Sequence, residues 1–241
     1  MRVTLSNPAK RNALDRELLD ALTAALRGLD ARCVILTGEG DVFSAGYDIA
    51  DLSPERLAEE AAALLTHPFE AAVSALDAVP VPVVAAMGGH AFGGGLELAL
   101  TCDLRVCTPR ARLGMPPARL GVVYSHTGLR RFVDAIGSAR TRELFFTARP
   151  VDAAEALSWG LVNEVVEDVA ARSVALASEI AALAPLSQRG NKRALQALAP
   201  DVDPALEAEL HAQRDGAFRS ADFAEGVRAF IEKRQPEWRG R

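Results

Sequence analysis

The chain has 241 residues, of which 49% are hydrophobic, so it is long enough to bury one well-filled α/β core. Its formal net charge of -5, without a basic stretch interleaved with aromatic residues, makes nucleic acid a poor candidate partner. No uncharged apolar window reaches the length that spans a bilayer, and we expect a cytoplasmic protein. The three cysteines lack metal-ligand or redox spacing, so buried thiols are expected, with no disulfide and no metal site.

Short β-branched runs alternate with glycine-bearing turns and with stretches of helical periodicity along most of the chain. This alternation is typical of an α/β architecture built in layers. The predicted strands cover residues 2–5, 32–37, 82–87, 103–108 and 161–166.

Helical spacing of apolar residues predicts a first helix within residues 14–29, with Asp15 as its N-cap and Gly28 near its end. Further helices are predicted at 53–65, 68–79, 169–183, 186–198, 204–218 and 220–234. The chain therefore divides into a core of residues 1–167 and a helical region of residues 168–241. We expect this helical region to serve as a lid or an oligomerisation element.

Five glycines fall between Gly88 and Gly95, in the stretch MGGHAFGGGLELALTCD. Neither a phosphate-binding loop nor a dinucleotide fingerprint fits their spacing, and a hydrolase elbow fails around Ser44. What remains is a strand that runs through a turn into a helix. The backbone N–H groups at the start of such a helix lack intrahelical acceptors and favour an anionic oxygen.

A second stretch, VILTGEGDVFSAGYDIADL, has the same outline of strand, glycine-bearing loop and turn. If the two turns face one another, the N–H groups of Tyr47 and Gly94 would both point at one carbonyl oxygen. Such an oxyanion hole typically contributes about 3–4 kcal/mol per donor to a developing oxyanion. The alternative is that the glycines only permit a tight turn and close packing of helix on strand.

The segments NPAKRNAL, VFSAGYDI, HAFGGGLELALTCD, LGMPPARLGVVYSHTG and ALSWGLVNEVV resemble, in order and spacing, the crotonase superfamily, the enoyl-CoA hydratase/isomerase group. The resemblance covers essentially the whole chain. It implies a spiral of repeated ββα units with helical C-terminal elements, a homotrimer or homohexamer, and an acyl-CoA thioester as substrate. No cofactor is implied beyond the coenzyme A of that substrate. The residues that match the family's acyl-CoA contacts are Ala45, Tyr47, Asp48, Ile49, Gly94 and Lys233.

The same resemblance assigns Tyr47 and Gly94 as the two backbone donors that stabilise a thioester enolate, and Glu97 as a catalytic carboxyl group. Enoyl-CoA hydratases use a second glutamate at the position of Pro117, and proline can neither take nor give a proton. Hydration normally depends on both carboxylates. Ordinary hydration and double-bond migration are therefore both less favoured as the function of this chain.

Decarboxylation of a malonyl-type thioester forms the enolate by expelling carbon dioxide and needs no base to remove a carbon-bound proton. The sequence around Tyr124 resembles that of the methylmalonyl-CoA decarboxylase branch, in which a tyrosine at that position lies in the active site. Two alternatives stay open. One is a hydratase or isomerase that works with Glu97 alone, helped by water or His126; the other is a non-catalytic acyl-CoA-binding protein.

Each of these side chains also has an ordinary structural interpretation. Glu97 would be an acid of a first helical turn that only interacts with the helix dipole. Tyr124 would be a packed ring with a satisfied hydroxyl group. Lys233 would be part of a solvated helix end, and Arg119 a surface charge.

Overall fold

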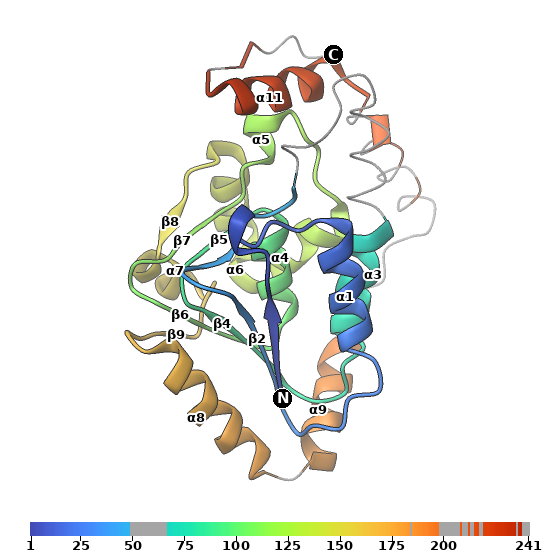
Figure 1. Ribbon diagram of the computed structural model, residues 1–241, viewed down its shortest axis with the longest axis vertical. Helices are drawn as coiled ribbons and strands as arrows, with labels where there is room; N and C mark the ends of the chain where they lie inside the picture. The colour runs from blue at the N-terminus through green and yellow to red at the C-terminus, as the bar shows by residue number, and fades with distance from the viewer. Residues whose placement is uncertain are drawn as a thin grey trace.

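The computed structural model describes residues 1–48, 67–183, 185–197, 208, 212, 215–216, 219–234 and 236–237. A five-stranded parallel sheet with the order β1-β2-β4-β6-β9 forms its centre (Figure 1). Its members are β1 (Arg2–Leu5), β2 (Val34–Gly38), β4 (Val83–Met87), β6 (Leu104–Cys107) and β9 (Glu164–Val165). Four of them lie within the runs predicted from the sequence, and β2 extends one residue beyond its run, to Gly38, so all five predicted strands are confirmed.

The apolar residues of this sheet are buried on both faces, as its continuous hydrophobic strands require. Along β2, Val34 and Leu36 belong to the main core, whereas Ile35 between them packs into a second cluster on the opposite face. Val83 and Val84 of β4 divide in the same way. This alternation follows from successive side chains of a strand pointing to opposite faces.

A smaller four-stranded sheet, with the order β3-β5-β7-β8, lies beside the first. Its strands were not predicted, and they are short: β3 (Val42–Ser44), β5 (His90–Phe92), β7 (Arg112–Gly114) and β8 (Val151–Asp152). The first three are parallel, and β8 is antiparallel to β7. The strands follow one another in the pairs β2/β3, β4/β5 and β6/β7. In each pair the first strand belongs to the large sheet and the second to the small sheet, and a helix follows each pair. The chain thus forms the predicted spiral of ββα units.

Helices cover the sheets and connect their strands. Asp15 caps the first helix through a hydrogen bond from the Leu18 N–H at 2.8 Å, as predicted. Proline at positions 80 and 82 follows the end of the predicted helix at 68–79, which the structure ends at Asp77. The helices are η1 (Pro8–Lys10), α1 (Arg16–Ala25), α3 (His67–Asp77), α4 (Gly94–Thr101), α5 (Pro117–Leu120), α6 (His126–Thr147), α7 (Ala153–Trp159), α8 (Val169–Ala181), α9 (Pro185–Ala197) and α11 (Ala221–Glu232).

The C-terminal helices lie at different ends of the molecule (Figure 1). Helix α8 packs Val169 and Ile180 against the outer face of the large sheet. Helix α9 is tied to the same sheet by Lys192, whose Nζ donates to Asp103 Oδ2 at 2.7 Å and to the Val81 carbonyl at 3.0 Å. Helix α11 packs on α5 at the opposite end. The predicted helix at 53–65 and most of the one at 204–218 lie outside the described residues.

None of the described helices is both long and apolar enough to cross a membrane.

Candidate functional site

The candidate site lies at the carboxyl ends of the three parallel strands of the small sheet. Strand β3 leads into Tyr47, β5 leads into Gly94, and β7 leads through α5 toward Tyr124. Because these strands are neighbours in the order β3-β5-β7, their following loops emerge at one edge of the sheet. The topology therefore brings together three segments that are far apart in the sequence.

The loop after β3 is held by polar contacts to the segment before α1. Asn12, fully buried, donates from Nδ2 to the carbonyl groups of Glu39 and Val42 at 2.9 and 2.7 Å. Ser44 donates from Oγ to the Asn12 carbonyl at 2.8 Å, and the same oxygen accepts from the Gly46 N–H at 3.2 Å. These contacts fix the turn that presents Tyr47.

The backbone of Tyr47 is oriented by its pairing with Leu14. Leu14 donates its N–H to the Gly46 carbonyl at 2.7 Å and accepts from the Asp48 N–H at 3.1 Å. In a parallel bridge the amide groups alternate in direction, so the Tyr47 N–H is turned away from Leu14. Gly94 begins α4, where the N–H groups lack acceptors within the helix.

The two turns lie against each other, as the sequence analysis required for an oxyanion hole. A Cβ atom placed on Gly93 would be 3.9 Å from the Cα of Gly46. A Cβ placed on Gly94 would be 2.8 Å from Cζ and 3.2 Å from Oη of Tyr47. The Tyr47 ring therefore lies directly over Gly94, and a larger residue there would collide with it. That both N–H groups bind one oxygen stays a prediction.

Glycine is required at position 95 because Ser44 packs closely against its backbone. A Cβ on this residue would lie 2.5 Å from Cβ and 2.7 Å from Oγ of Ser44, closer than real side chains come. The packing role that we considered as an alternative is therefore real for Gly95. Close packing also applies to Gly94, beneath the Tyr47 ring, and to Gly89, whose Cβ would lie 1.7 Å from the Asp41 carbonyl oxygen. It is compatible with a role for the backbone N–H of Gly94.

Glu97, in the first turn of α4, is only 3% exposed. Its Oε2 accepts a hydrogen bond from the Tyr124 hydroxyl group. Burial raises its pKa to about 7, although the bond from Tyr124 and the charge of Arg131 both act to lower it. At neutral pH this carboxyl group therefore exists in both protonation states, as a general acid or base requires.

Arg131 of α6 lies beside Glu97, with Nε 3.9 Å from Oε1. Its guanidinium is bound mainly to Asp77 at the end of α3, at 3.2 and 2.6 Å. Asp77 and Glu70 of the same helix act to raise the pKa of Glu97. The Asp77 carboxylate thus offsets much of the effect that the positive charge of Arg131 has on the pKa of Glu97.

Tyr124 is fixed by its ring and by its hydroxyl group. Its ring meets Phe145 edge-on at 5.4 Å, and a Cβ on Gly128 would be only 2.6 Å from its Cε1. Its hydroxyl group donates to Glu97 Oε2. Burial and the neighbouring Glu97 charge raise the pKa of Tyr124 well above its usual value, so it is a neutral phenol at physiological pH.

The other predicted acyl-CoA contacts are placed as follows. The Ala45 N–H donates to the Arg11 carbonyl at 3.0 Å, and Asp48 forms an ion pair with Lys10 at 2.6 Å. Ile49 lies outside the described residues. Lys233 is exposed and ends α11 in a left-handed conformation, with φ of 54°. Pro117, buried, begins α5.

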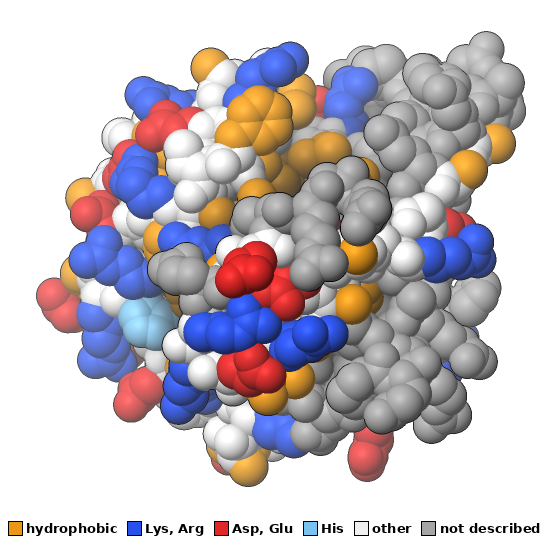
Figure 2. Space-filling view, turned by 90° about the horizontal axis from the view of Figure 1, so that it is seen from above, with side chains coloured by type: hydrophobic (Ala, Val, Ile, Leu, Met, Phe, Trp, Pro, Cys, Tyr) orange, Lys and Arg blue, Asp and Glu red, His pale blue; other side chains and the backbone are white. Residues whose placement is uncertain are grey.

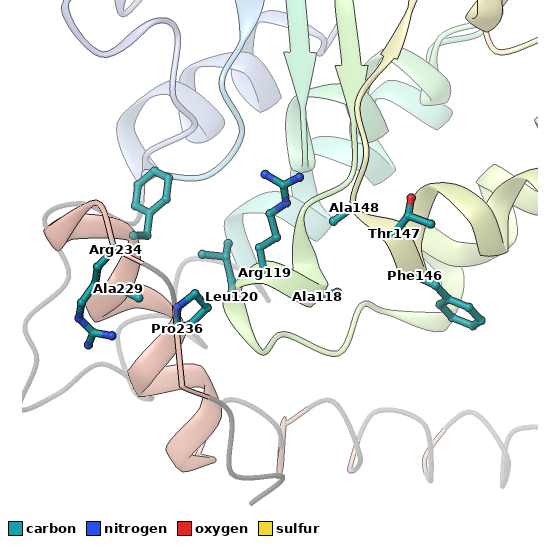
Figure 3. Close-up of a pocket in the computed structure, with 10 residues that line it drawn as sticks. Ala118, Arg119, Leu120, Phe146, Thr147, Ala148, Ala229, Arg234 and Pro236 are labelled. Carbon is teal, nitrogen blue, oxygen red and sulfur yellow. The ribbon is translucent and has the colours of Figure 1, made fainter.

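A pocket of about 520 Å³ lies between α5, the end of α6 and the end of α11 (Figure 3). Arg119 and Arg234 line it, together with Phe146 and Phe230, but Lys233 is not among its lining residues. Arg234 forms an ion pair with Glu225 at 2.6 Å. Among the described residues on the face shown in Figure 2, acidic and basic side chains are interspersed.

A family model described as Enoyl-CoA hydratase/isomerase matches residues 1–241. The chain belongs to this family. It is 35% identical over 249 residues to "Probable enoyl-CoA hydratase echA8" of Mycobacterium leprae (strain TN), covering 98% of this chain and 93% of that protein. It is 36% identical over 246 residues to "Probable enoyl-CoA hydratase echA6" of Mycobacterium bovis (strain ATCC BAA-935 / AF2122/97), covering 100% and 96%.

Among solved structures, the chain is similar to methylmalonyl-CoA decarboxylase in complex with 2-nitronate-propionyl-CoA, with a TM-score of 0.90 and 29% identity. The match covers 100% of this chain and 95% of that one. Together these likenesses identify an acyl-CoA enzyme of the crotonase superfamily. The crotonase-like fold predicted from the sequence is confirmed.

Three parts of the site were not predicted from the sequence: Arg131, Asp77 and the side chain of Tyr47. Arg131 and Asp77 carry no motif, and their proximity to Glu97 depends on how α6 and α3 pack on α4. For Tyr47 the sequence indicated a role for the backbone N–H only. The run of small residues around it, with Gly94 opposite, was the available signal that a large ring had space there.

Proposed function

We propose that this enzyme decarboxylates a short malonyl-type CoA thioester such as methylmalonyl-CoA. The observation that carries the proposal is the hydrogen bond between Tyr124 and Glu97. The described partner of the buried carboxyl group is a neutral phenol, and Pro117 stands where the resemblance to hydratases expects a second carboxylate. The similarity to the methylmalonyl-CoA decarboxylase structure supports the same assignment.

In the proposed reaction the thioester oxygen accepts hydrogen bonds from the N–H groups of Tyr47 and Gly94. The bond between the α-carbon and the carboxylate breaks, carbon dioxide leaves, and the electron pair passes into the enolate. Negative charge develops on the thioester oxygen, where each backbone donor contributes about 3–4 kcal/mol. Since no carbon-bound proton is removed, this step needs no catalytic base.

The reaction is completed when the α-carbon of the enolate takes a proton. Glu97 is suited to supply it, because burial raises its pKa to about 7 and keeps part of the population protonated at neutral pH. Tyr124 is in direct contact with this carboxyl group. It is therefore placed to orient the carboxyl group or to pass its proton on.

A second candidate function is hydration of an enoyl-CoA thioester. The names of the bacterial relatives favour it, and a carboxyl group with a pKa of about 7 also suits a general base. Glu97 alone would then have to activate water and supply the proton to the α-carbon.

The deciding experiment is turnover by the purified protein of methylmalonyl-CoA and, in parallel, crotonyl-CoA, followed by mass spectrometry. Formation of propionyl-CoA with release of carbon dioxide, without hydration of crotonyl-CoA, is the result expected from the proposal. Efficient hydration of crotonyl-CoA without decarboxylation would overturn it in favour of the second candidate. Binding of both thioesters without turnover would identify the chain as a non-catalytic acyl-CoA-binding protein.

A further inference from the structure

Arg131 has a buried hydrogen-bond donor that is not used by the described residues. Its two terminal nitrogens donate to the Asp77 carboxylate, at 3.2 and 2.6 Å. Its Nε is buried and forms no hydrogen bond with the part of the chain that the structure describes. A buried donor without an acceptor is costly and rare in native proteins, so it calls for an explanation. Oε1 of Glu97 lies 3.9 Å from this nitrogen, slightly beyond hydrogen-bond distance.

The two carboxyl oxygens of Glu97 have different surroundings. Oε2 accepts the hydrogen bond from the Tyr124 hydroxyl group. Oε1 lies against the first turn of α6, where a Cβ on Gly128 would be 2.9 Å away, and accepts no hydrogen bond from the described residues. The carbonyl oxygen of a neutral carboxyl group is its better acceptor, so the bond from Tyr124 places the carboxyl proton on Oε1. The oxygen beside Arg131 is therefore the one that gains and loses the proton.

The guanidinium of Arg131 can bind both acids at once. It has five N–H donors in a planar fork. Asp77 occupies the end that carries the two terminal nitrogens, which leaves the Nε–H for a second acceptor. The same ion pair joins α6 to the end of α3 and holds Nε close to Oε1 of Glu97. A movement of about 1 Å would bring these two atoms to the usual hydrogen-bond distance of about 2.9 Å.

We propose that Arg131 is a positioning residue that binds Glu97 in only one protonation state: its Nε–H donates to Oε1 once that oxygen has lost its proton. The inference rests on the proposed function, in which Glu97 protonates the enolate. The Oε1–H bond breaks, its hydrogen forms the new C–H bond at the α-carbon, and the electron pair stays on Oε1. The Nε–H then forms a charge-assisted hydrogen bond with this oxygen, which stabilises the carboxylate. Uptake of a proton from water breaks that bond and restores the acid.

The charged and titratable groups that act on Glu97 set the pH at which this change occurs. Tyr124 precedes α6, Arg131 lies in α6, and Asp77 and Glu70 belong to α3. With these neighbours the pKa of Glu97 is about 7. The bond from Nε to Oε1 should therefore be absent well below this pH and present well above it.

The Nε–H of Arg131 can be observed by ¹³C-detected NMR of protein labelled with ¹³C,¹⁵N-arginine, with the signal assigned by correlation to its own backbone. Arg130 is the matched control, because its Nε donates to Asp134 at 2.7 Å. We expect hydrogen exchange of the Arg131 Nε–H with water to slow, relative to that of Arg130, as Glu97 ionises. Glu97→Gln should abolish this transition. A relative exchange rate that stays constant across the ionisation of Glu97 would overturn the proposal, and this measurement requires no substitution of Arg131.

Two substitutions of Arg131 separate the hydrogen bond from the charge. Arg131→Gln removes both, whereas Arg131→Lys keeps a positive charge without an Nε–H. In each variant the Glu97 carboxylate loses its donor. Its titration midpoint, followed by ¹³C NMR of labelled glutamate, should therefore rise above that of the parent in both. A midpoint in Arg131→Lys equal to that of the parent would show that the charge alone suffices, and would overturn the proposal.

The inference and the proposed function fail separately, because neither NMR experiment requires turnover. Turnover of methylmalonyl-CoA by the same preparation completes the test, and decarboxylation together with the exchange transition at Arg131 is the expected result. The transition without decarboxylation would overturn the proposed function and leave the hydrogen bond of Arg131 standing. Decarboxylation without the transition would overturn the inference alone.

Discussion

The guanidinium of Arg131 and the carboxylate of Asp77 form two parallel hydrogen bonds, at 3.2 and 2.6 Å, that join α6 to α3. This ion pair lies beside Glu97, with Arg131 Nε 3.9 Å from its Oε1. Asp77 therefore competes with Glu97 for a single positive charge. The competition helps to keep the pKa of Glu97 at about 7.

Replacing Asp77 by Asn should lower the pKa of Glu97. The substitution removes a negative charge that raises this pKa and frees Arg131 to interact with Glu97. We expect the titration midpoint of the Glu97 carboxyl group, measured by ¹³C NMR of labelled glutamate, to move below that of the parent. Asp134→Asn is the matched control, because Asp134 pairs at 2.7 Å with exposed Arg130. An equal shift in both variants would contradict the explanation.

Tyr124→Phe should have the opposite effect on the same group. The hydrogen bond from the Tyr124 hydroxyl group stabilises the Glu97 carboxylate, so its loss should raise the pKa of Glu97 further. In the same NMR titration the midpoint should move above that of the parent. A midpoint that stays in place would show that the bond does not favour the ionised form.

Glu97→Gln should separate the two candidate reactions. Decarboxylation forms the enolate without a base, so release of carbon dioxide from methylmalonyl-CoA should fall by no more than about 10-fold. Any hydration of crotonyl-CoA should fall by about 10²–10⁴-fold, the usual contribution of a general acid or base. Glu179→Gln, at an exposed ion pair with Arg172, serves as the control. Loss of decarboxylation on the hydratase scale would contradict the proposed mechanism.

The buried carboxyl group of Glu97 should also make stability depend on pH. Its pKa is about 7 in the folded protein and near its ordinary value of 4.5 in the unfolded chain. Between these values the folded protein holds a proton that the unfolded chain has released, so the free energy of unfolding falls as the pH rises. By about pH 8 the loss amounts to about 3 kcal/mol.

Glu97→Gln should abolish this contribution. Urea denaturation at about pH 4.5 and about pH 8 should show the difference in free energy of unfolding, variant minus parent, increasing by about 3 kcal/mol toward the higher pH. The comparison between the two proteins cancels the carboxyl groups that they share. A pH-independent difference would mean that Glu97 is ionised at no cost.

Gly95→Ala should destabilise the protein, because its new Cβ would lie 2.5 Å from Ser44 Cβ and 2.9 Å from the Ser44 carbonyl oxygen. Overpacking of this kind typically costs about 1–3 kcal/mol. Gly190→Ala, in α9, meets nothing within 4 Å and should be neutral or slightly stabilising. The free energy of unfolding, measured by urea denaturation, should therefore fall in Gly95→Ala and stay the same or rise slightly in Gly190→Ala. Similar losses in both would contradict the role assigned to Ser44.

The large sheet was predictable because each of its strands is a continuous apolar run buried on both faces, such as Val83–Met87. The small sheet was not, because its strands have two or three residues and carry no periodic pattern. Gly94, Glu97 and Tyr124 stood out through motifs and family resemblance. The contacts between Tyr124, Arg131 and Glu97 could not be predicted, because they depend on how α6 crosses α4.

The residues proposed to act in the reaction follow strands of the small sheet, whereas the large sheet supplies much of the core. The three parallel strands of the small sheet end in loops that carry Tyr47, Gly94 and Tyr124, while the large sheet and its buried apolar strands contribute none of these residues. A residue in one of these loops can therefore be exchanged while the apolar strands of the large sheet stay unchanged. Such a scaffold would let new reactions evolve by successive single replacements around the proposed pair of backbone donors, Tyr47 and Gly94.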